Sequence, residues 1–346
     1  MLFKQYQMNI LKDELLEHRS FLRLTRDYAL EMSESCQVQQ GDLKISLKDS
    51  GVLVFEPENP GPFDIIISSG IHGNETAPIE ICDLLVKEIL SGTVVVKNRL
   101  LVIIGNPVAM NSGKRFENEN LNRLFCGKHQ GKSHPEARRA ERLEHFTREF
   151  FNHREPVERC HFDLHTAIKA SKYEKFVIYP YQDGREWSRE YLNFFKHCDI
   201  NTILLAHQGA GTFAYFSSHQ FQANAFTVEL GQVKAFGENQ MSSFAGVINN
   251  LKALISNTYV KVKEFSNNDF NLFQVIDEVM RNSDTGFLLN INSDVANFST
   301  FAIGFKLTTD DNASYYMKSD QHAIVFPNAA VPLGQRVALI AEKTII

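Results

Sequence analysis

The sequence predicts an α/β fold with a mixed central sheet flanked by helices, followed by a smaller C-terminal all-β, barrel-like domain. Between residues 40 and 257, short apolar runs rich in β-branched residues alternate with helical patterns. This alternation is typical of strands and helices that build one sheet. From about residue 260 onward, the apolar runs are short, alternate with period two and are broken by Asn, Asp, Ser and Gly. That pattern favours strands joined by turns.

The predicted elements follow one another along 346 residues. Helical spacing over residues 20–30 predicts an N-terminal helix, and residues 42–47 and 51–55 predict a hairpin at a sheet edge. The predicted inner strands span residues 65–68, 100–104, 160–164, 176–179, 202–205 and 225–228. The predicted helices span residues 76–90, 135–152, 188–198 and 240–256. The predicted C-terminal strands include residues 259–262, 301–305, 323–326 and 337–340.

Chain length sets the expected domain organisation. Single cores usually stop growing at roughly 250–300 residues, so we expect more than one domain. We expect a helical extension over residues 1–35, a main domain over 36–258 and a β domain over 259–346.

Composition excludes several classes of protein. A net charge of −5 argues against non-specific nucleic-acid binding, which usually needs a basic face. The five cysteines are widely spaced and contain no C-x-x-C pair, which indicates reduced thiols. The N-terminus has no signal-peptide apolar core, and nowhere do eighteen apolar residues run together. We therefore expect a soluble cytoplasmic protein that binds neither nucleic acid nor membrane; its oligomeric state stays open.

A histidine and a glutamate occupy the turn after the first inner strand. His72 and Glu75 are three residues apart, between the apolar run ending near Ser68 and the helix beginning at Thr76. The carboxyl edge of an open α/β sheet is where ligands bind. Such a pair can reach one metal ion from the same side of a turn, although the spacing also occurs by chance.

A third ligand candidate follows another predicted strand. His165 stands at the end of the run from Cys160 to Leu164, which places it at the same edge. Asp163, two residues earlier, can lie on the same face and accept a hydrogen bond from a ligand imidazole. A simple polar turn is the alternative for both residues.

Glu229 is a charge inside an apolar strand run. A carboxylate there lies either on a solvated edge or in a cleft. Beside a metal it can accept a proton from water and pass it to a leaving nitrogen.

The polar stretch from Gly113 to Phe125 follows the strand that ends near Ile104. Its Arg115 and Arg123 suit carboxylate recognition, because guanidinium binds carboxylates in a bidentate fork. Arg115 can also stabilise an oxyanion, and Asn122 can add a hydrogen bond. A solvated basic loop is the alternative.

Four ordered segments give a family resemblance. They are His72-Gly73-Asn74-Glu75, Asn122-Arg123, Asp163-Leu164-His165-Thr166 and Glu229-Leu230-Gly231. In this order they resemble the zinc carboxypeptidase-like hydrolases, and more narrowly the aspartoacylase/succinylglutamate desuccinylase family, over about residues 40 to 345. The chain differs from aspartoacylases at Asn120, where they place an acidic residue, and in having Val-Glu-Leu-Gly around Glu229. Both differences weaken an assignment to acetylaspartate.

The resemblance implies a zinc carboxypeptidase-like fold and one Zn²⁺ per subunit held by His72, Glu75 and His165. It further implies that Glu229 is the general base and acid, that Arg115 polarises the scissile carbonyl, and that Asn122 and Arg123 bind a substrate carboxylate. The implied reaction is cleavage of N2-succinyl-L-glutamate to succinate and L-glutamate, the last step of arginine catabolism by the succinyltransferase pathway.

Two alternative functions remain open from the sequence. One is an N-acyl amino acid hydrolase of the aspartoacylase type, and the other is a non-catalytic metal- or metabolite-binding module. The presence of Glu229 argues against the second, because a pure binder has no need of a proton-transfer group. A Ser or Cys nucleophile is disfavoured, since the chain has no G-x-S-x-G segment and no Cys beside a predicted base.

Overall fold

The computed structural model describes residues 15–30, 35–154, 157–262, 264–311 and 313–346. These residues form a mixed sheet of 13 strands in the order β1-β2-β3-β5-β4-β6-β9-β7-β8-β10-β15-β14-β12, with a separate β11-β13 pair. The strands of the main body are β1 (Cys36–Gln40), β2 (Leu43–Asp49), β3 (Val52–Pro57), β4 (Phe63–Ser69), β5 (Arg99–Ile104), β6 (Glu158–Ala167), β7 (Lys175–Tyr179), β8 (Thr202–Leu205) and β9 (Asn224–Gln232). The predicted hairpin and all six predicted inner strands are therefore confirmed.

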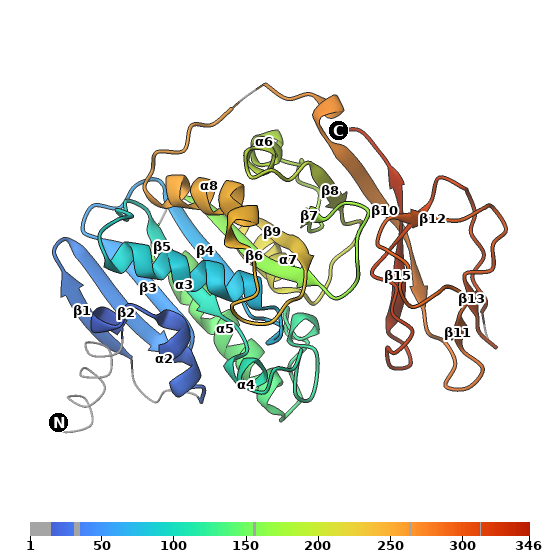
Figure 1. Cartoon of the computed structure of the whole chain (residues 1–346), viewed down its shortest axis with the longest axis horizontal. Helices are drawn as coiled ribbons and strands as arrows, with labels where there is room; N and C mark the ends of the chain where they lie inside the picture. Colours follow the sequence, from blue (N-terminus) through green and yellow to red (C-terminus); the bar gives the residue numbers. More distant parts are fainter. Residues whose placement is uncertain (1–14, 31–34, 155–156, 263, 312) are drawn as a thin grey trace.

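Helices cover both faces of this sheet (Figure 1). They are α2 (Phe21–Asp27), α3 (Thr76–Leu90), α4 (Pro107–Asn111), α5 (Pro135–Phe151), α6 (Arg189–His197), α7 (Phe213–Phe221) and α8 (Ala245–Ile255), with short 3-10 turns η2 (Leu121–Arg123), η3 (Met241–Phe244) and η4 (Asn267–Asp269). The four helices predicted in the main domain are all present, and the last of them begins as η3. The predicted N-terminal helix is present as α2; residues 1–14 and 31–34 of the expected extension lie outside the described residues.

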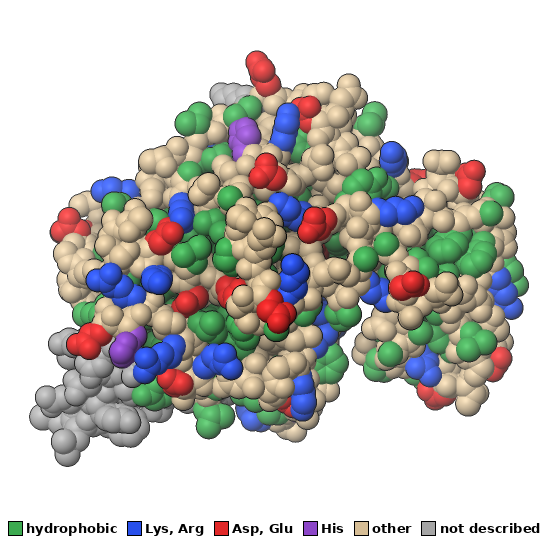
Figure 2. Space-filling view, viewed as in Figure 1, with side chains coloured by type: hydrophobic (Ala, Val, Ile, Leu, Met, Phe, Trp, Pro, Cys, Tyr) green, Lys and Arg blue, Asp and Glu red, His purple; other side chains and the backbone are tan. Residues whose placement is uncertain are grey.

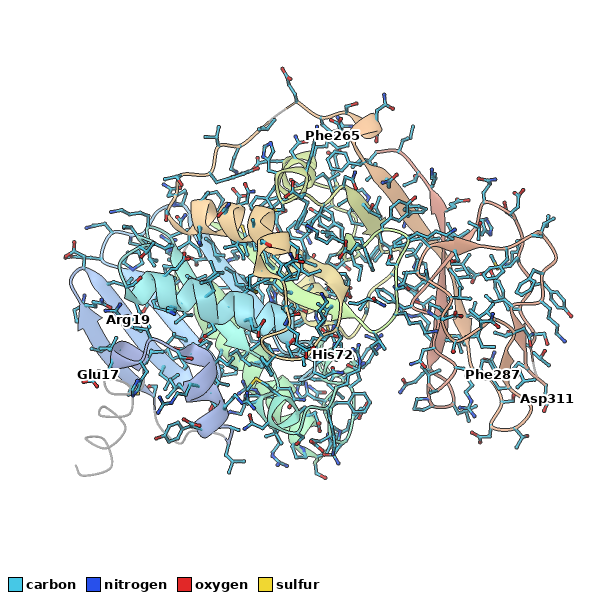
Figure 3. The ribbon with its side chains drawn as sticks, in the orientation of Figure 1. Glu17, Arg19, His72, Phe265, Phe287 and Asp311 are labelled. Atoms are coloured by element: carbon cyan, nitrogen blue, oxygen red, sulfur yellow. The ribbon has the colours of Figure 1, made fainter. Side chains whose placement is uncertain are left out.

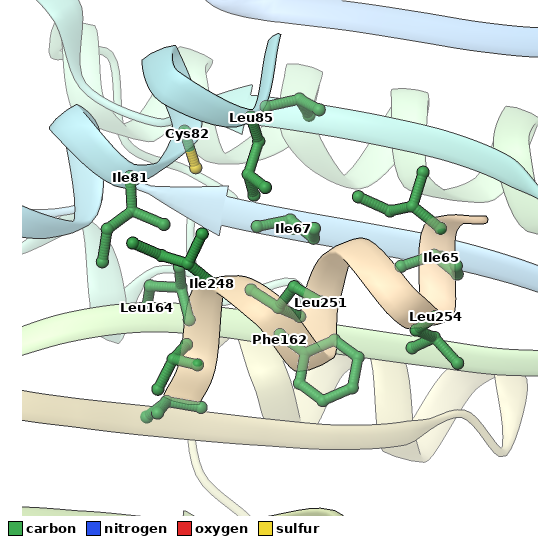
Figure 4. Packing of buried hydrophobic residues seen from close by; sticks show 14 of the residues in the cluster. Ile65, Ile67, Ile81, Cys82, Leu85, Phe162, Leu164, Ile248, Leu251 and Leu254 are labelled. Carbon is green, nitrogen blue, oxygen red and sulfur yellow. The ribbon is translucent and has the colours of Figure 1, made fainter. Parts of the chain in front are cut away.

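Strand β4 contributes side chains to a hydrophobic core on each face of the sheet. All seven of its residues are buried, and successive side chains of a strand point to opposite faces. Ile65 and Ile67 pack with α3 and α8 on one face, as Figure 4 shows, while Ile66 packs with residues of α5 and α7 on the other. A strand buried on both faces reads as a continuous apolar run, which is how it was recognisable in the sequence.

The parallel strands place the candidate site. β4 pairs in parallel with both β5 and β6, and β6 pairs in parallel with β9. Their carboxyl ends therefore share one edge of the sheet. In this register, His165 of β6 lies directly beside Glu229 of β9.

The C-terminal β region continues the central sheet. It contains β10 (Asn271–Met280), β11 (Leu288–Leu289), β12 (Ser299–Thr300), β13 (Thr308–Thr309), β14 (Ala323–Val325) and β15 (Arg336–Lys343). β10 pairs in parallel with β8 and antiparallel with β15. The predicted β-rich region is confirmed, and its first long strand is also the next strand of the main sheet.

Two predicted C-terminal strands are wrong. Residues 259–262 form an irregular connection in which Val260 is 76% exposed; its alternating pattern lacks a partner strand. Residues 301–305 form a turn at Gly304, where φ is 80°. That turn stacks Phe301 on Phe305 with ring centroids 4.7 Å apart, so the spacing of the aromatic residues reflects a turn. The strands predicted at 323–326 and 337–340 are present as β14 and β15.

None of the helices among the described residues is long and apolar enough to cross a membrane.

Candidate active site

The turn from β4 into α3 carries His72 and Glu75. Gly73 is required at its centre, because a Cβ atom there would collide with the backbone of Ala109 and Met110 in α4. The backbone N–H of Gly73 donates to the carbonyl oxygen of Arg115, 3.1 Å away. The close approach of α4 therefore ties the turn to the loop that carries the candidate substrate-binding residues.

Three buried side chains converge at this turn. His72, Glu75 and His165 each offer a ligand atom, and these atoms lie within 4.8 Å of one another. None of the three side chains is more than about one-twentieth exposed. The structure thus brings together the three residues that the sequence analysis predicts as metal ligands. In Figure 3, His72 lies on the side of the main body that faces the C-terminal β region.

Hydrogen bonds fix the orientation of both imidazoles. The Nε2 of His72 lies 2.9 Å from the Oδ1 of Asn120, which also accepts from the backbone N–H of Asn122. The Nε2 of His165 lies 2.9 Å from a carboxylate oxygen of Asp163. Since both partners are acceptors, each Nε2 carries its proton. Both Nδ1 atoms then point at Glu75, each 2.9 Å from one of its oxygens.

This donor set fits a divalent metal such as zinc. Burial lowers the pKa of His72 to about 4, so at neutral pH its Nδ1 presents a lone pair to a carboxylate oxygen. Two acceptors facing one another call for a cation between them. Two imidazoles and one carboxylate, with each imidazole N–H held by an outer acceptor, are the ligand types of hydrolytic zinc sites.

Glu229 lies inside the sheet beside these ligands. β9 is paired on both sides, with β6 and with β7, and Glu229 is only 7% exposed. The exposed-edge alternative is therefore excluded. Its Oε2 is buried and has no hydrogen-bond partner among the described residues. Burial raises the pKa of Glu229 to about 7; His165 opposes the rise and the Glu75 carboxylate adds to it. An unpartnered carboxyl group with a pKa near neutrality is suited to accept and donate a proton.

Arg115 reaches the same centre from the loop after α4. Its guanidinium donates to the Oε1 of Glu75 at 2.6 Å, and its side chain is 28% exposed. The head group thus lies between the buried ligands and solvent, where it can also reach a bound carbonyl or carboxylate oxygen.

Asn122 and Arg123 form η2 on the same loop. The Oδ1 of Asn122 accepts from the backbone N–H of Phe213 at the start of α7, 2.9 Å away, so its amide nitrogen is the group that remains for a substrate. The Arg123 side chain is accessible to solvent. The surrounding protein nevertheless lowers its pKa below the usual value, and the nearby charges of Arg336 and Arg115 lower it further. The guanidinium stays protonated at neutral pH.

Glu136 anchors this loop from the first turn of α5. It is 2% exposed, and its Oε1 accepts from the backbone N–H groups of Glu117 and Asn118 at 2.7 and 3.1 Å. Hydrogen bonds to a charged acceptor are about twice as strong as neutral ones. Glu136 therefore holds the segment between Arg115 and Asn122 in place.

Replacing Glu136 with alanine is expected to lower kcat/KM by about 10- to 100-fold, because a displacement of about 1 Å in a positioning loop has effects of this size. Bound metal should be unchanged. Steady-state kinetics with metal analysis checks the result, and Glu136→Gln, which retains an acceptor oxygen, is the matched control. Wild-type kcat/KM in the alanine variant would show that the loop does not depend on Glu136.

Sequence reasoning did not identify Asn120, Glu136 or Arg336 as residues near the site. Asn120 was noted only as a difference from aspartoacylases, yet it binds the Nε2 of His72. Arg336 of β15 lies more than 200 positions from the loop and gave no local signal; it comes near Arg123 because β15 pairs with β10, which in turn pairs with β8.

Two family models and several known proteins match this chain. Residues 62–255 match the family model described as the succinylglutamate desuccinylase/aspartoacylase catalytic domain. Residues 268–344 match the barrel-sandwich hybrid domain of the same family. A curated succinylglutamate desuccinylase of Shewanella frigidimarina is 44% identical over 330 residues, covering 94% of this chain and 96% of that protein.

Solved structures give the same result. A succinylglutamate desuccinylase from Vibrio parahaemolyticus is 34% identical, with a TM-score of 0.86 and coverage of 95% of this chain and 96% of that chain. One from Chromobacterium violaceum is also 34% identical, with a TM-score of 0.83 and coverage of 94% and 98%. With both of its domains matched at this coverage, the chain belongs to the succinylglutamate desuccinylase/aspartoacylase family.

Proposed function

We propose that this chain is a zinc-dependent amide hydrolase that cleaves N2-succinyl-L-glutamate to succinate and L-glutamate, the last step of arginine catabolism by the succinyltransferase pathway. The relatives' names support the reaction. The observation that carries it is the buried carboxyl group of Glu229, whose Oε2 has no hydrogen-bond partner among the described residues, beside a His-Glu-His cluster. A binding module has no use for such a group, whereas hydrolysis of an amide requires one.

Each residue then has one task. His72, Glu75 and His165 would hold the metal ion, which when bound would act as a Lewis acid and lower the pKa of a water molecule. Glu229 accepts the proton of the attacking water and delivers it to the departing glutamate nitrogen. Arg115 donates to the oxygen of the scissile carbonyl as negative charge develops there. Asp163 keeps His165 in the orientation that the structure shows.

Recognition of the substrate falls to the arginines. Succinylglutamate carries three carboxylates, and the asparagine amide of Asn122 with the guanidinium of Arg123 suits one of them. Figure 2 shows an indentation between the main body and the C-terminal β region, with Lys and Arg side chains on both sides. Arg336, in the C-terminal β region, is close enough to Arg123 for their charges to interact. Its guanidinium forms an ion pair with the carboxylate of Glu278 at 3.1 Å.

Replacing Arg336 with glutamine is expected to raise KM for succinylglutamate by about tenfold or more with little change in kcat, since a hydrogen bond to a charged group contributes about 1.5–3 kcal/mol. The control is Lys318→Gln, because Lys318 pairs with Asp277, whose side chain leaves β10 on the opposite face from Glu278. Equal KM values for both variants would show that Arg336 does not bind the substrate.

The substrate assignment is tested by comparing kcat/KM for succinylglutamate, acetylaspartate and a C-terminal peptide. We expect succinylglutamate to be preferred, since the arginines match its extra carboxylate. A preference of about tenfold or more for either of the others would contradict the assignment, because a site built for a charged group rejects analogues that lack it.

We also propose that the enzyme works in the cytoplasm. All five cysteines are free thiols, four of them buried, as expected in a reducing compartment.

A further inference from the structure

A buried chain of hydrogen bonds extends from His165 away from the cleft. Asp163 accepts from His165 through Oδ2 and from Ser68 through Oδ1, at 2.9 and 2.5 Å. The hydroxyl of Ser68 lies 2.7 Å from the Nε2 of His161. The Nδ1 of His161 lies 2.7 Å from the hydroxyl of Ser217 in α7. Ser68, Asp163, His161 and Ser217 are all fully buried.

The proton positions along this chain are determined. A carboxylate can only accept, so the hydroxyl proton of Ser68 is used in its bond to Asp163. Ser68 must then accept from the Nε2–H of His161. Burial lowers the pKa of His161 to about 4, so the ring is neutral and its Nδ1 accepts from the hydroxyl of Ser217. Every donor from Ser217 to Ser68 therefore points toward Asp163.

The far end of the chain is held rigidly. The ring of His161 packs edge-on against Phe213, with centroids 4.6 Å apart. The backbone N–H of Phe213 donates to Asn122. Helix α7 thus contacts both the chain that reaches the candidate metal centre and the loop that carries a candidate substrate-binding residue. Burying the polar imidazole costs free energy unless its nitrogens are hydrogen-bonded. An apolar side chain would fill the same space without that cost, so packing alone does not explain a histidine here.

We propose that His161 is a positioning residue for the metal centre. Through Ser68 it fixes the Asp163 carboxylate, and Asp163 in turn holds the Nε2–H of His165, so that the Nδ1 of His165 faces Glu75 and the metal. This role rests on the proposed metal ligation but not on the identity of the substrate. Outer partners of this kind typically change metal affinity by about 10- to 100-fold.

The proposal is tested by zinc affinity, measured on the purified full chain by competition with a chromogenic chelator. Two substitutions of His161 separate its two hydrogen bonds. In His161→Gln the amide nitrogen takes the place of Nε2 and can still donate to Ser68. In His161→Asn the shorter amide reaches only the position of Nδ1, beside Ser217. We expect the asparagine variant to bind zinc about tenfold more weakly and the glutamine variant to remain close to wild type.

Ser68→Ala independently removes another link in the series of hydrogen bonds. It should weaken zinc binding as His161→Asn does. Its matched control is Ser69→Ala, because Ser69 is equally buried but donates to the carbonyl of Ile103, outside the chain. Thermal unfolding of the metal-free proteins separates loss of fold from loss of affinity. If Ser69→Ala lowers stability but keeps wild-type affinity while Ser68→Ala loses affinity, the positioning role is supported.

Two results would overturn the proposal. One is wild-type zinc affinity in both His161→Asn and Ser68→Ala. The other is an equal loss in the glutamine and asparagine variants, which would show that only the ring's volume matters. Failure of the wild-type chain to bind zinc at all would instead refute the proposed metal centre, so the two failures are distinguishable.

Discussion

Replacing Glu229 with glutamine is expected to lower kcat by about 10²- to 10⁴-fold while leaving bound metal unchanged, because general acid–base catalysis contributes effects of this size. Glutamine has nearly the same shape but cannot accept the proton of the attacking water. The Oε2 of Glu229 has no hydrogen-bond partner in the part of the chain that the structure describes, so the substitution breaks no hydrogen bond there. Single-turnover kinetics and metal analysis on the same preparation measure both quantities.

The pH dependence of the wild-type enzyme should report the same group. Glu229 acts as a base only when ionised, and burial places its pKa at about 7. Bound cation favours the ionised form and lowers this value, so kcat/KM should fall with decreasing pH at or below about 7. Wild-type turnover in Glu229→Gln, or an unchanged acid limb in its residual activity, would remove Glu229 from the reaction.

Replacing Glu75 with glutamine is expected to release the metal and reduce activity by about 10³-fold or more, since Lewis-acid stabilisation supplies several kcal/mol. Glu75 is the centre of the cluster: its two oxygens face the Nδ1 atoms of His72 and His165, and Arg115 donates to one of them. A neutral amide removes the negative charge that holds the metal.

The measurement is metal content after dialysis, followed by activity with and without added zinc. Excess zinc should restore part of the activity, because both imidazoles remain. His72→Ala removes a different candidate ligand of the same cluster, and this variant should also lose metal. Stoichiometric metal and full activity in Glu75→Gln would show that this cluster is not the metal centre.

Much of the fold could be predicted because local patterns and tertiary roles agree. The strand at β4 was visible as an apolar β-branched run since both of its faces are buried. The helix from Thr76 to Leu90 was predicted with the bounds that the structure shows. The candidate ligands were also predictable, because His72 and Glu75 follow β4 and His165 lies near the end of β6, and both strands end at the same edge of the sheet.

What could not be predicted depends on contacts between distant parts of the chain. The sequence gives no sign that β10 joins β8, since both runs look like ordinary strands. Arg336 lies in β15, which pairs with β10, so its position near Arg123 depends on both pairings of β10. His161 read as one residue of an apolar strand, and its role depends on Ser68 and Ser217 from two other elements.

The most direct test of the account is a zinc titration of the metal-free chain, with glutamate release from succinylglutamate as the signal. The account predicts that activity rises linearly and saturates at about one zinc per chain, as three protein ligands and one open position require. Glutamate release that is independent of zinc, or none at saturating zinc, would contradict it.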